Sequence, residues 1–349
     1  MVGAFRKPSS GRRDEPIHSI SKQYSIQTLE RVYKHYYFII RGGKEMAGFP
    51  LKRKKNRVNK KNVGLFFIAP YFIMFLLFTF YPIAYTFRLS FFNWDGLGSP
   101  EFVGLANYAR LIGDKVFIKS IWNTIFIALV AMVPQMVFGL VLAFVLNQKR
   151  LRGSSFFKTV FYFPNLVTAV SLGVLFSLLF DWKVGSVNQV LMSLHLISEP
   201  INWKGNALYS QLIVAFVLFW QYFGYYTIIF TAGIRGIPYD LFEAAELDGA
   251  SKVQIFFRIV LPLLRPIMTF AFVTSIIGGL QIFDLPYTFG GNAGGTGNSL
   301  LTMVMYMYNT AFRNLDYGYG AAISYGLFVI IIIFSLIFMK YTTGKKEQY

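Results

Sequence analysis

The chain has 349 residues, of which 55% are apolar and 19% aromatic, whereas only 14% carry a charge. This composition is typical of a protein that crosses a membrane several times. The absence of cysteine excludes a disulfide scaffold and any cysteine-based metal site. Only three histidines occur, so we expect no histidine-based metal centre and no cofactor bound by the chain itself.

The net charge of +18 is concentrated at the N-terminus. Residues 1–62 hold 16 Lys or Arg against 4 Asp or Glu. A basic flank before the first apolar run is an ordinary signal of membrane topology, so the charge does not indicate nucleic-acid binding. We expect a flexible cytoplasmic arm here, without a cleavable signal peptide. A further hypothesis is that translation naturally begins at Met46, which makes residues 1–45 an optional extension.

Six apolar runs follow, each near or above the length of about 20 residues that crossing a bilayer requires. They are 63–92, 119–147, 157–180, 209–233, 267–289 and 320–341. The sequence therefore predicts an all-α polytopic membrane protein with six transmembrane helices. The transmembrane domain covers residues 63–341, and a short tail covers residues 342–349.

The basic residues are distributed unevenly between the two sides of these runs. Of the 34 Lys and Arg residues, 27 lie in the arm, in loops 148–158 and 234–266, or in the tail from Lys340. By the positive-inside rule these segments face the cytoplasm. Both termini are therefore predicted to be cytoplasmic, and the longer connectors 93–118, 181–208 and 290–319 are predicted to lie outside.

The fourth run concentrates polar-tipped aromatic and amide side chains near its middle. These are Trp220, Gln221, Tyr222, Tyr225 and Tyr226, of which the first four are the candidate pathway residues. One interpretation is helix packing together with an aromatic belt at the membrane interface. The other is the lining of an internal pathway, which agrees better with their position, because a belt lies at the ends of a span and these residues do not.

Residues 238–262 form an ordered polar segment between the fourth and fifth runs. Pro238 suits a helix start, good helix formers follow, Gly249 offers a stop, and apolar residues then return at helical spacing up to Pro262. The pattern predicts a helix, a glycine break and a second helix. Such a hairpin could rest on the membrane surface, but its acidic first half would be repelled by an anionic leaflet. A groove on a soluble partner protein is therefore the favoured contact.

The fifth run carries two polar groups at membrane depth, Gln281 and Asp284. Asp284 is the single carboxylate within any of the six runs. An ionisable group at such a depth is a functional candidate. Two roles stay open for it: direct contact with a transported substrate, and a gate or structural position near the glycine-rich turn 290–298.

The segment EAAELDGA at 243–250, followed by F-x-x-I-x-L-P, resembles the cytoplasmic coupling loop of the membrane subunits of ATP-binding-cassette importers. Ten positions match in order: Glu243, Ala244, Ala245, Asp248, Gly249, Ala250, Phe256, Ile259, Leu261 and Pro262. The resemblance extends from FNWDG and FVGLANYARL before residue 112 to GYGAA at 318–322, and it does not cover residues 1–60. The chain is most similar to the first permease of maltose-, glycerol-phosphate- and arabinose-type sugar uptake systems.

This resemblance implies the type I importer fold and a subunit of the bacterial cytoplasmic membrane. It also implies four partners: a second homologous permease, an ATPase dimer, an extracytoplasmic sugar-binding protein and the sugar itself. The sequence holds no phosphate-binding loop of the form GxxxxGK[ST], so ATP and magnesium are expected on the partner ATPase and the chain is not expected to be an enzyme.

The position of the fourth-run pathway residues relative to the coupling loop implies, by the resemblance, that they contact the sugar. Gln281 and Asp284 of the fifth run complete the predicted substrate pathway as its polar groups at membrane depth. The alternative function is a secondary transporter or channel driven by an ion gradient. Such proteins usually have inverted repeats and several intramembrane charges, and this sequence shows neither feature.

Overall fold

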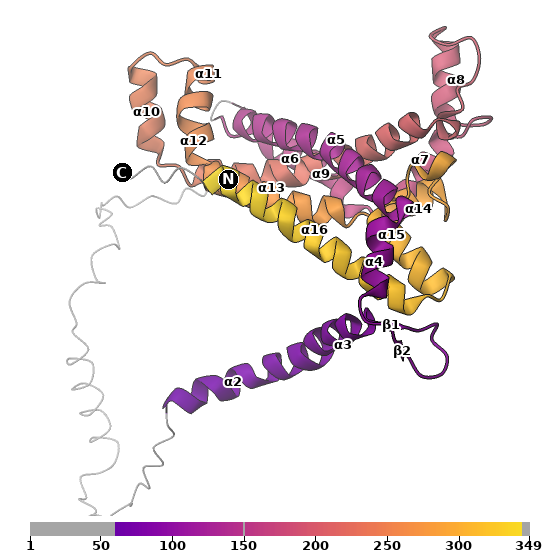
Figure 1. Cartoon of the computed structure of the whole chain (residues 1–349). Coiled ribbons are helices and arrows are strands. Elements are labelled where there is room, and N and C mark those ends of the chain that lie inside the picture. Colours follow the sequence, from indigo (N-terminus) through magenta and orange to yellow (C-terminus); the bar gives the residue numbers. More distant parts are fainter. Residues whose placement is uncertain (1–59, 149–150, 344–349) are drawn as a thin grey trace, which may run out of the picture. The chain divides into compact units, whose positions relative to one another are not determined.

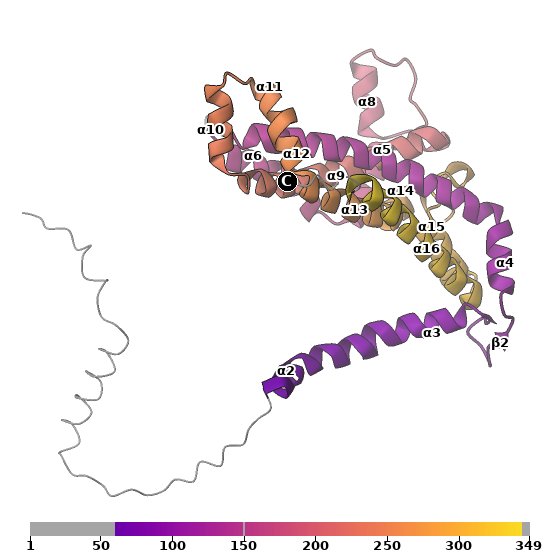
Figure 2. The same cartoon turned by 60° about the vertical axis from the view of Figure 1, so that its left-hand side comes forward.

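The computed structural model of the protein describes residues 60–148 and 151–343 (Figures 1 and 2). Most of the predicted arm, the proposed start at Met46 and the end of the predicted tail, 344–349, lie outside the described residues. The chain divides into two compact units, Met1–Ile68 and Ala69–Tyr349. Within the first unit only residues 60–68 are described, so the fold below is that of the second.

Within residues 60–148 and 151–343, five helical segments are long and apolar enough to cross a membrane. They are Leu65–Leu89, Lys115–Leu146, Ala207–Arg235, Arg265–Gly290 and Tyr317–Lys340. A sixth crossing is formed if Ser154–Leu166 and Ala169–Leu179, which are bent by 89° at their junction, are taken as one span. The predicted all-α fold with six runs is confirmed, with the qualification that the third run is a bent pair of helices.

The bend has a local cause. α6 (Ser154–Tyr162) continues into the 3-10 helix η2 (Phe163–Leu166), which contains Pro164. Proline cannot donate a backbone hydrogen bond, so the α-helical ladder ends here. The chain then becomes extended at Val167, and Thr168 starts α7 (Ala169–Leu179) by accepting a hydrogen bond from the backbone N–H of Ser171.

The remaining elements follow in chain order. Before the bent pair lie α2 (Lys60–Phe75), the π-helix η1 (Leu76–Phe80), α3 (Tyr81–Leu89), β1 (Phe92–Asn93), β2 (Glu101–Phe102), α4 (Ala106–Gly113) and α5 (Lys115–Leu146). After it come α8 (Ser186–Ser193), the 3-10 helix η3 (Trp203–Gly205), α9 (Ala207–Arg235), α10 (Tyr239–Leu247), α11 (Lys252–Ile255), the π-helix η4 (Phe256–Val260) and α12 (Leu261–Leu263). The last elements are α13 (Arg265–Leu280), α14 (Asp284–Gly290), the 3-10 helix η5 (Thr296–Asn298), α15 (Met303–Tyr308), the π-helix η6 (Asn309–Arg313) and α16 (Tyr317–Thr343).

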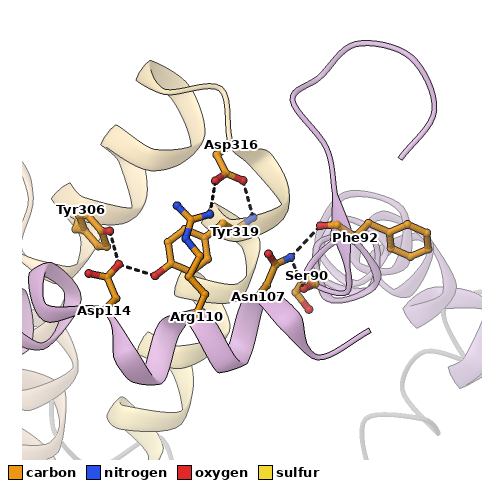
Figure 3. A network of polar contacts seen from close by, with 8 residues as sticks. All are labelled: Ser90, Phe92, Asn107, Arg110, Asp114, Tyr306, Asp316 and Tyr319. Atoms are coloured by element: carbon orange, nitrogen blue, oxygen red, sulfur yellow. Dashed lines mark hydrogen bonds and ion pairs between the residues drawn. The ribbon is translucent and has the colours of Figure 1, made fainter. Parts of the chain in front are cut away.

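The two strands form a short antiparallel pair in which Phe92 lies opposite Phe102. Next to this pair, Asn107 on α4 is buried and donates hydrogen bonds to the carbonyls of Ser90 and Phe92 at 3.0 and 2.9 Å (Figure 3). The hydroxyls of Ser90 and Tyr108 share a further hydrogen bond of 2.7 Å. These contacts fasten the end of α3 to α4.

The centre of the second unit is the pairing of α5 with α9. Glycine permits their close approach, because a Cβ added at Gly139 would lie 3.0 Å from the Cβ of Tyr226. α6 packs against α9 even more tightly. A Cβ added at Gly224 on α9 would lie 1.8 Å from the carbonyl oxygen of Phe161 on α6. Many large apolar side chains elsewhere are exposed, as expected for helices that face lipid.

The fifth crossing is interrupted at membrane depth. α13 ends at Leu280, and α14 begins only at Asp284 after a turn in which Phe283 has φ −137° and ψ −59°. The hydroxyl of Thr302 donates a hydrogen bond of 2.8 Å to the carbonyl of Ile282 and so satisfies one group that the break frees. Irregular backbone at this depth is tolerated where it is buried in protein or lines a cavity.

Candidate functional site

Two features of the second unit are candidates for function: the hairpin between α9 and α13, and a cavity beside the break in the fifth crossing. Figures 1 and 2 show α10 and α11 as neighbouring short helices at the end of the bundle where α5 and α6 meet. We call residues 238–262 the hairpin. It has the order that the sequence predicts, a helix, a glycine break and a second helix.

The reversal of the hairpin depends on Gly249. Its φ of +78° lies in the left-handed region, which glycine adopts at little cost. Its N–H donates to the carbonyl of Glu246 at 3.1 Å, and the N–H of Ala250 donates to the carbonyl of Ala245 at 2.9 Å. These two bonds form a Schellman motif, which closes the end of α10.

The second helix of the hairpin starts with a capping box. The side chain of Ser251 accepts from the backbone N–H of Gln254 at 3.3 Å, and the side chain of Gln254 accepts from the backbone N–H of Ser251 at 2.7 Å. An ion pair between Lys252 and Glu246 joins the two arms of the hairpin. Both ends of the reversal are therefore held by local bonds, and the hairpin is an ordered element.

One face of the hairpin packs against the bundle. Ile255 and Val260 are buried in a cluster with residues of α5, α9 and α13. The ring of Phe256 lies 5.1 Å from the ring of Phe144 near the end of α5. The hairpin is thus packed against α5, α9 and α13.

The opposite face is exposed and mixes apolar with acidic groups. Leu247 is 89% exposed and Val253 is 64% exposed, and the neighbouring Glu243 and Asp248 are exposed as well. The ten predicted coupling residues divide between the two faces: Ala245, Ala250, Phe256, Ile259 and Leu261 are half-buried, whereas Glu243, Ala244, Asp248, Gly249 and Pro262 are exposed. The outward face of the hairpin therefore carries exposed apolar side chains beside acidic ones.

A cavity of about 600 Å³ lies between the hairpin and the C-terminal end of α5. It is lined by Phe144, Asn147, Gln148, Ile234, Tyr239, Phe242, Glu246, Gly249, Ala250, Lys252 and Ile255. Side chains therefore do not fill all of the space between the hairpin and α5. This space leaves room for the hairpin to shift against α5.

A second cavity, of about 410 Å³, lies where the middle parts of α5, α9 and α13 meet the break before α14. We call it the tyrosine cavity. Its apolar lining consists of Ala128, Ala131, Ala169, Leu218, Gly278, Gly279, Ile282, Phe283 and Leu285. Its polar lining consists of Gln135, Gln221, Tyr222, Tyr225, Tyr226, Thr274, Ser275, Gln281 and Asp284. Its volume falls within the range of about 300–1,000 Å³ that small-molecule sites occupy.

Two buried amides in this cavity lack a hydrogen-bond partner for their oxygen. Gln135 on α5 is 6% exposed, and its Nε2 donates to the hydroxyl of Ser275 at 3.0 Å. Gln221 on α9 is 3% exposed, and its Nε2 donates to the carbonyl of Val167 at 3.0 Å. Among the described residues, neither Oε1 atom has a partner. Buried polar groups without a partner are costly to the folded state.

The structure brings most of the predicted pathway residues together. Gln221, Tyr222, Tyr225, Gln281 and Asp284 all line the tyrosine cavity. Trp220 does not line it. Its ring lies 5.8 Å from the ring of Phe176 and packs against an apolar cluster around α7 and α9. Asp284 opens α14 directly beside the cavity.

Sequence reasoning missed Gln135 and Ser275 as parts of the same cavity, and it noted Tyr226 without counting it among the pathway residues. Gln135 and Ser275 are polar residues inside apolar runs, and the rule that singled out Asp284 could have been applied to them as well. What the sequence does not reveal is that Gln135 and Ser275, 140 positions apart, face each other.

At the opposite end of α5 from the hairpin, a polar network centres on Asp114 (Figure 3). Its Oδ1 caps α5 by accepting from the N–H groups of Val116 and Phe117 at 2.8 and 3.2 Å. Its Oδ2 accepts from the hydroxyls of Tyr306 and Tyr319 at 2.5 and 2.6 Å. Partial burial alone would raise the pKa of Asp114, but these four hydrogen bonds lower it. Burial and the hydrogen bond to this carboxylate raise the pKa of Tyr306 to about 12.

Arg110 extends the network to the start of α16. Its guanidinium forms an ion pair with Asp316 at 2.8 Å and lies 3.7 Å from the centre of the Tyr319 ring. Asp316 also accepts from the backbone N–H of Tyr319 at 3.1 Å. Burial lowers the pKa of Arg110, but the hydrogen bond and charge of Asp316 outweigh it, so the pKa is raised. The Asp114 network, made of these residues and Tyr306, ties the α4–α5 junction to α15 and α16.

Within the described residues, no group of three or more His, Cys, Asp or Glu side chains is placed to hold a metal ion. The polar groups at membrane depth are amides, hydroxyls and one carboxylate, which suit the binding of an uncharged polar molecule more than metal or nucleophilic chemistry. The chain thus has a polar cavity between α5, α9 and α13 and, packed on the same helices, a partly exposed hairpin.

Comparisons with known proteins agree with this arrangement. Residues 124–343 match the family described as binding-protein-dependent transport system inner membrane component. The chain is 36% identical over 291 residues to the probable ABC transporter permease protein YurN of Bacillus subtilis, covering 82% of this chain and 98% of that protein. It is 32% identical over 287 residues to the lactose transport system permease protein LacF of Rhizobium radiobacter, covering 82% and 95%.

The fold also matches a solved transporter. A bacterial alginate ABC transporter, determined in complex with an alginate pentasaccharide-bound periplasmic protein, superposes with a TM-score of 0.70 at 20% identity, covering 80% of this chain and 95% of that chain. The protein is therefore a multi-pass membrane protein with the fold of an ABC importer permease. The chain belongs to the family of binding-protein-dependent transport system inner membrane components.

Proposed function

We propose that this chain is the transmembrane permease subunit of an ATP-driven sugar importer that receives its substrate from a binding protein. The observation that carries the proposal is the presence, in one chain, of a polar cavity at membrane depth and an ordered, exposed hairpin at the end of the same helices. The cavity would bind the sugar, and the hairpin would bind the protein that supplies the energy.

The hairpin suits contact with a soluble ATPase. Its exposed Leu247 and Val253 offer apolar area, and Glu243 and Asp248 add charge at the rim. A helix that presents apolar anchors to a groove on a partner is a common recognition mode. In this proposal ATP and magnesium are held by an ATPase dimer, and its closure moves the hairpin, α5 and α9 between inward-facing and outward-facing states.

The tyrosine cavity suits a sugar. The rings of Tyr222 and Tyr225 offer flat apolar faces together with hydroxyls, and Thr274, Gln281 and Asp284 add polar groups to the lining. The lactose permease LacF supports a saccharide as the substrate class, because a relative of this similarity commonly shares it. Family membership argues against the alternative of an ion-gradient-driven transporter or channel.

The remaining parts of the proposal concern topology and partners. The distribution of Lys and Arg supports cytoplasmic termini and a cytoplasmic hairpin in a bacterial cytoplasmic membrane. A second, homologous permease would complete the pathway. An extracytoplasmic sugar-binding protein would deliver the substrate at the other end of the helices; the alginate transporter, determined in complex with an alginate pentasaccharide-bound periplasmic protein, supports such a partner.

The proposal is tested by reconstituting the chain with its second permease, its ATPase and its binding protein in proteoliposomes. Sugar uptake is expected to require ATP hydrolysis and to proceed without an ion gradient. Glu243→Lys and Gly249→Pro are expected to abolish sugar-stimulated ATP hydrolysis, because the first reverses an exposed charge and proline cannot adopt the φ of +78° at position 249.

Matched controls are available elsewhere in the chain. Glu199 is another exposed glutamate, and Gly98 is another exposed glycine with positive φ and open space around its Cα. Glu199→Lys and Gly98→Pro are expected to leave stimulated hydrolysis intact. Normal hydrolysis in both hairpin variants, or sugar uptake driven by an ion gradient without ATP, would refute the proposed function.

A further inference from the structure

A groove lies between the end of α3, α4, the start of α5 and α16, apart from both the hairpin and the tyrosine cavity. Figures 1 and 2 show these elements meeting at the end of the bundle opposite the hairpin. We call this hollow the α4 groove, after the helix that supplies Tyr108, Leu111 and Ile112 to its lining. Its volume is about 630 Å³, which leaves room for a sizeable occupant.

The lining of the α4 groove is almost wholly apolar. Among the described residues that form it, the polar side-chain atoms are limited to the hydroxyls of Tyr108 and Tyr325. The Tyr108 hydroxyl shares a hydrogen bond of 2.7 Å with that of Ser90, and the Tyr325 hydroxyl donates to the carbonyl of Ile83 at 2.7 Å. A polar group placed here would leave water without gaining a hydrogen bond, which is costly. The groove therefore suits hydrocarbon.

The length of the groove favours a flexible chain over a helix of another subunit. On α16 the lining runs from Tyr325 to Ile330, which is about 9 Å along the axis at about 1.5 Å per residue. A helix that crosses the membrane spans about 30 Å of hydrocarbon and needs a contact surface of similar length. A lipid acyl chain is narrow and flexible, so it can enter a short groove.

A cation lies beside the groove. Arg88 follows the lining residue Phe87 at the end of α3, is exposed, and its guanidinium carbon lies 5.4 Å from the centre of the Phe92 ring. Neither of the two ion pairs among the described residues includes Arg88. It stands at the end of the crossing Leu65–Leu89, where lipid head groups begin. A planar guanidinium can bind a phosphate through two hydrogen bonds, so Arg88 complements a lipid phosphate at this depth.

We propose that the α4 groove binds one acyl chain of an anionic glycerophospholipid and that Arg88 holds the phosphate of the same molecule. The apolar groove and the cation beside it match the two parts of such a lipid. An anionic head group fits better than a zwitterionic one, because the latter carries its own cation close to Arg88. The inference goes beyond the proposed function, since it concerns a bound lipid and not the transported substrate.

The test uses the complete complex of this chain with its second permease and its ATPase, stripped of native lipid in a mild detergent. Phosphatidylglycerol with a photoreactive diazirine at the end of its acyl chain is added, and crosslinked peptides are identified by mass spectrometry. Crosslinks are expected on the groove walls of α4 and α16. Unlabelled phosphatidylglycerol is expected to raise the melting temperature more than phosphatidylcholine does, and inorganic phosphate is expected not to raise it.

Two variants with matched controls sharpen this measurement. Val329→Trp fills the groove from α16 and is expected to abolish the crosslinks. Val329 is 52% exposed, and the control Val174→Trp changes a valine of α7 that is 49% exposed and lies outside the groove. Arg88→Gln is expected to weaken phosphatidylglycerol binding about tenfold and to remove its advantage over phosphatidylcholine. Arg313→Gln is its control, because Arg313 is likewise exposed and belongs to neither ion pair.

Each other outcome overturns the inference. Crosslinks spread evenly over the lipid-facing helices, or equal shifts in melting temperature from the two lipids, would show only the general lipid shell of a membrane protein. Groove crosslinks in the isolated chain but not in the complete complex would show that the second permease covers the groove. Basal ATP hydrolysis reports whether Val329→Trp is folded, and if it is not, the loss or retention of lipid preference in Arg88→Gln decides.

Discussion

The Asp114 network and the tyrosine cavity are both polar and both involve α5, yet they differ in how their hydrogen bonds are completed. In the network the carboxylate of Asp114 accepts four hydrogen bonds, and Arg110 is paired with both Asp316 and the ring of Tyr319. In the cavity the buried amides of Gln135 and Gln221 each leave an oxygen without a partner among the described residues.

This difference separates a structural site from a binding site. A network whose members are all satisfied gains from being rigid, and nothing is left for a ligand to complete. A cavity whose lining keeps buried acceptors unpaired is less stable than one in which every polar group is paired. We therefore expect substitutions in the network to change stability with little effect on substrate binding, and substitutions in the cavity to do the opposite.

The largest effect is expected from Asp114→Ala. It removes the N-cap of α5 and the acceptor shared by two tyrosine hydroxyls, and we expect a loss of about 3 kcal/mol of unfolding free energy. Denaturation of the purified permease in detergent measures this loss. Asp95→Ala is the control, because Asp95 accepts one backbone bond in an exposed turn. A change of less than about 1 kcal/mol in Asp114→Ala would contradict a structural role.

The pH dependence of stability provides a second test of the network. The folded pKa of Asp114 is lowered, so its stabilising contribution is complete above the unfolded pKa, near 3.9, and is lost as the pH falls through the folded value. The pKa of Tyr306 is raised to about 12, so its contribution is complete below its unfolded pKa, near 10, and is lost as the pH rises through 12.

The difference in melting temperature between the wild type and Asp114→Asn is therefore expected to be constant from pH 5 to pH 9 and to shrink below pH 4. A difference that already shrinks between pH 7 and pH 5 would show that the carboxylate is not held ionised by its four donors.

The features that the sequence predicted well are those encoded locally. The hairpin follows from Pro238, the stop at Gly249 and the apolar spacing up to Pro262, all within one short segment. The apolar runs follow from composition, and the pathway residues of α9 drew notice because they lie within two turns of each other.

The features that it missed depend on residues far apart in the chain. Gln135 meets Ser275 across 140 positions, and Arg110 meets Asp316 across 206. Neither member of such a pair differs from an ordinary polar residue when it is considered alone. The 89° bend in the third crossing also escaped prediction, because Pro164 interrupts the helical ladder but does not set the direction in which the chain continues.

A smaller effect is expected from Gln135→Leu on the stability of the substrate-free protein. The change removes a buried unpaired oxygen, which favours folding, and also the hydrogen bond to Ser275, which opposes it. We expect these to offset to within about 1 kcal/mol. The same denaturation assay measures the result, with Gln211→Leu as the control. Gln211 is bonded to both Asn123 and Ser299, so its loss is expected to destabilise the protein clearly. Equal destabilisation by the two changes would contradict the view that the unpaired oxygen of Gln135 lowers the stability of the folded protein.

The smallest effect is expected from the ion pair of Arg110 with Asp316, and it tests whether every bond of the network matters equally. The two side chains are 57% and 25% exposed, and exposed pairs contribute about 0–1 kcal/mol. A double-mutant cycle of Arg110→Ala and Asp316→Ala is therefore expected to give a coupling energy of about 0.5 kcal/mol. This coupling should fall when salt is raised from about 0.1 M to about 1 M, because screening acts on exposed charges. Arg110 also contacts the Tyr319 ring, at 3.7 Å, and the double-mutant cycle does not measure that contact. Arg110→Ala should therefore keep a loss of unfolding free energy at high salt that Asp316→Ala does not show. If both single changes lose their effect in salt, the contact with the ring adds nothing, and the stability of the network comes from Asp114 and its four donors.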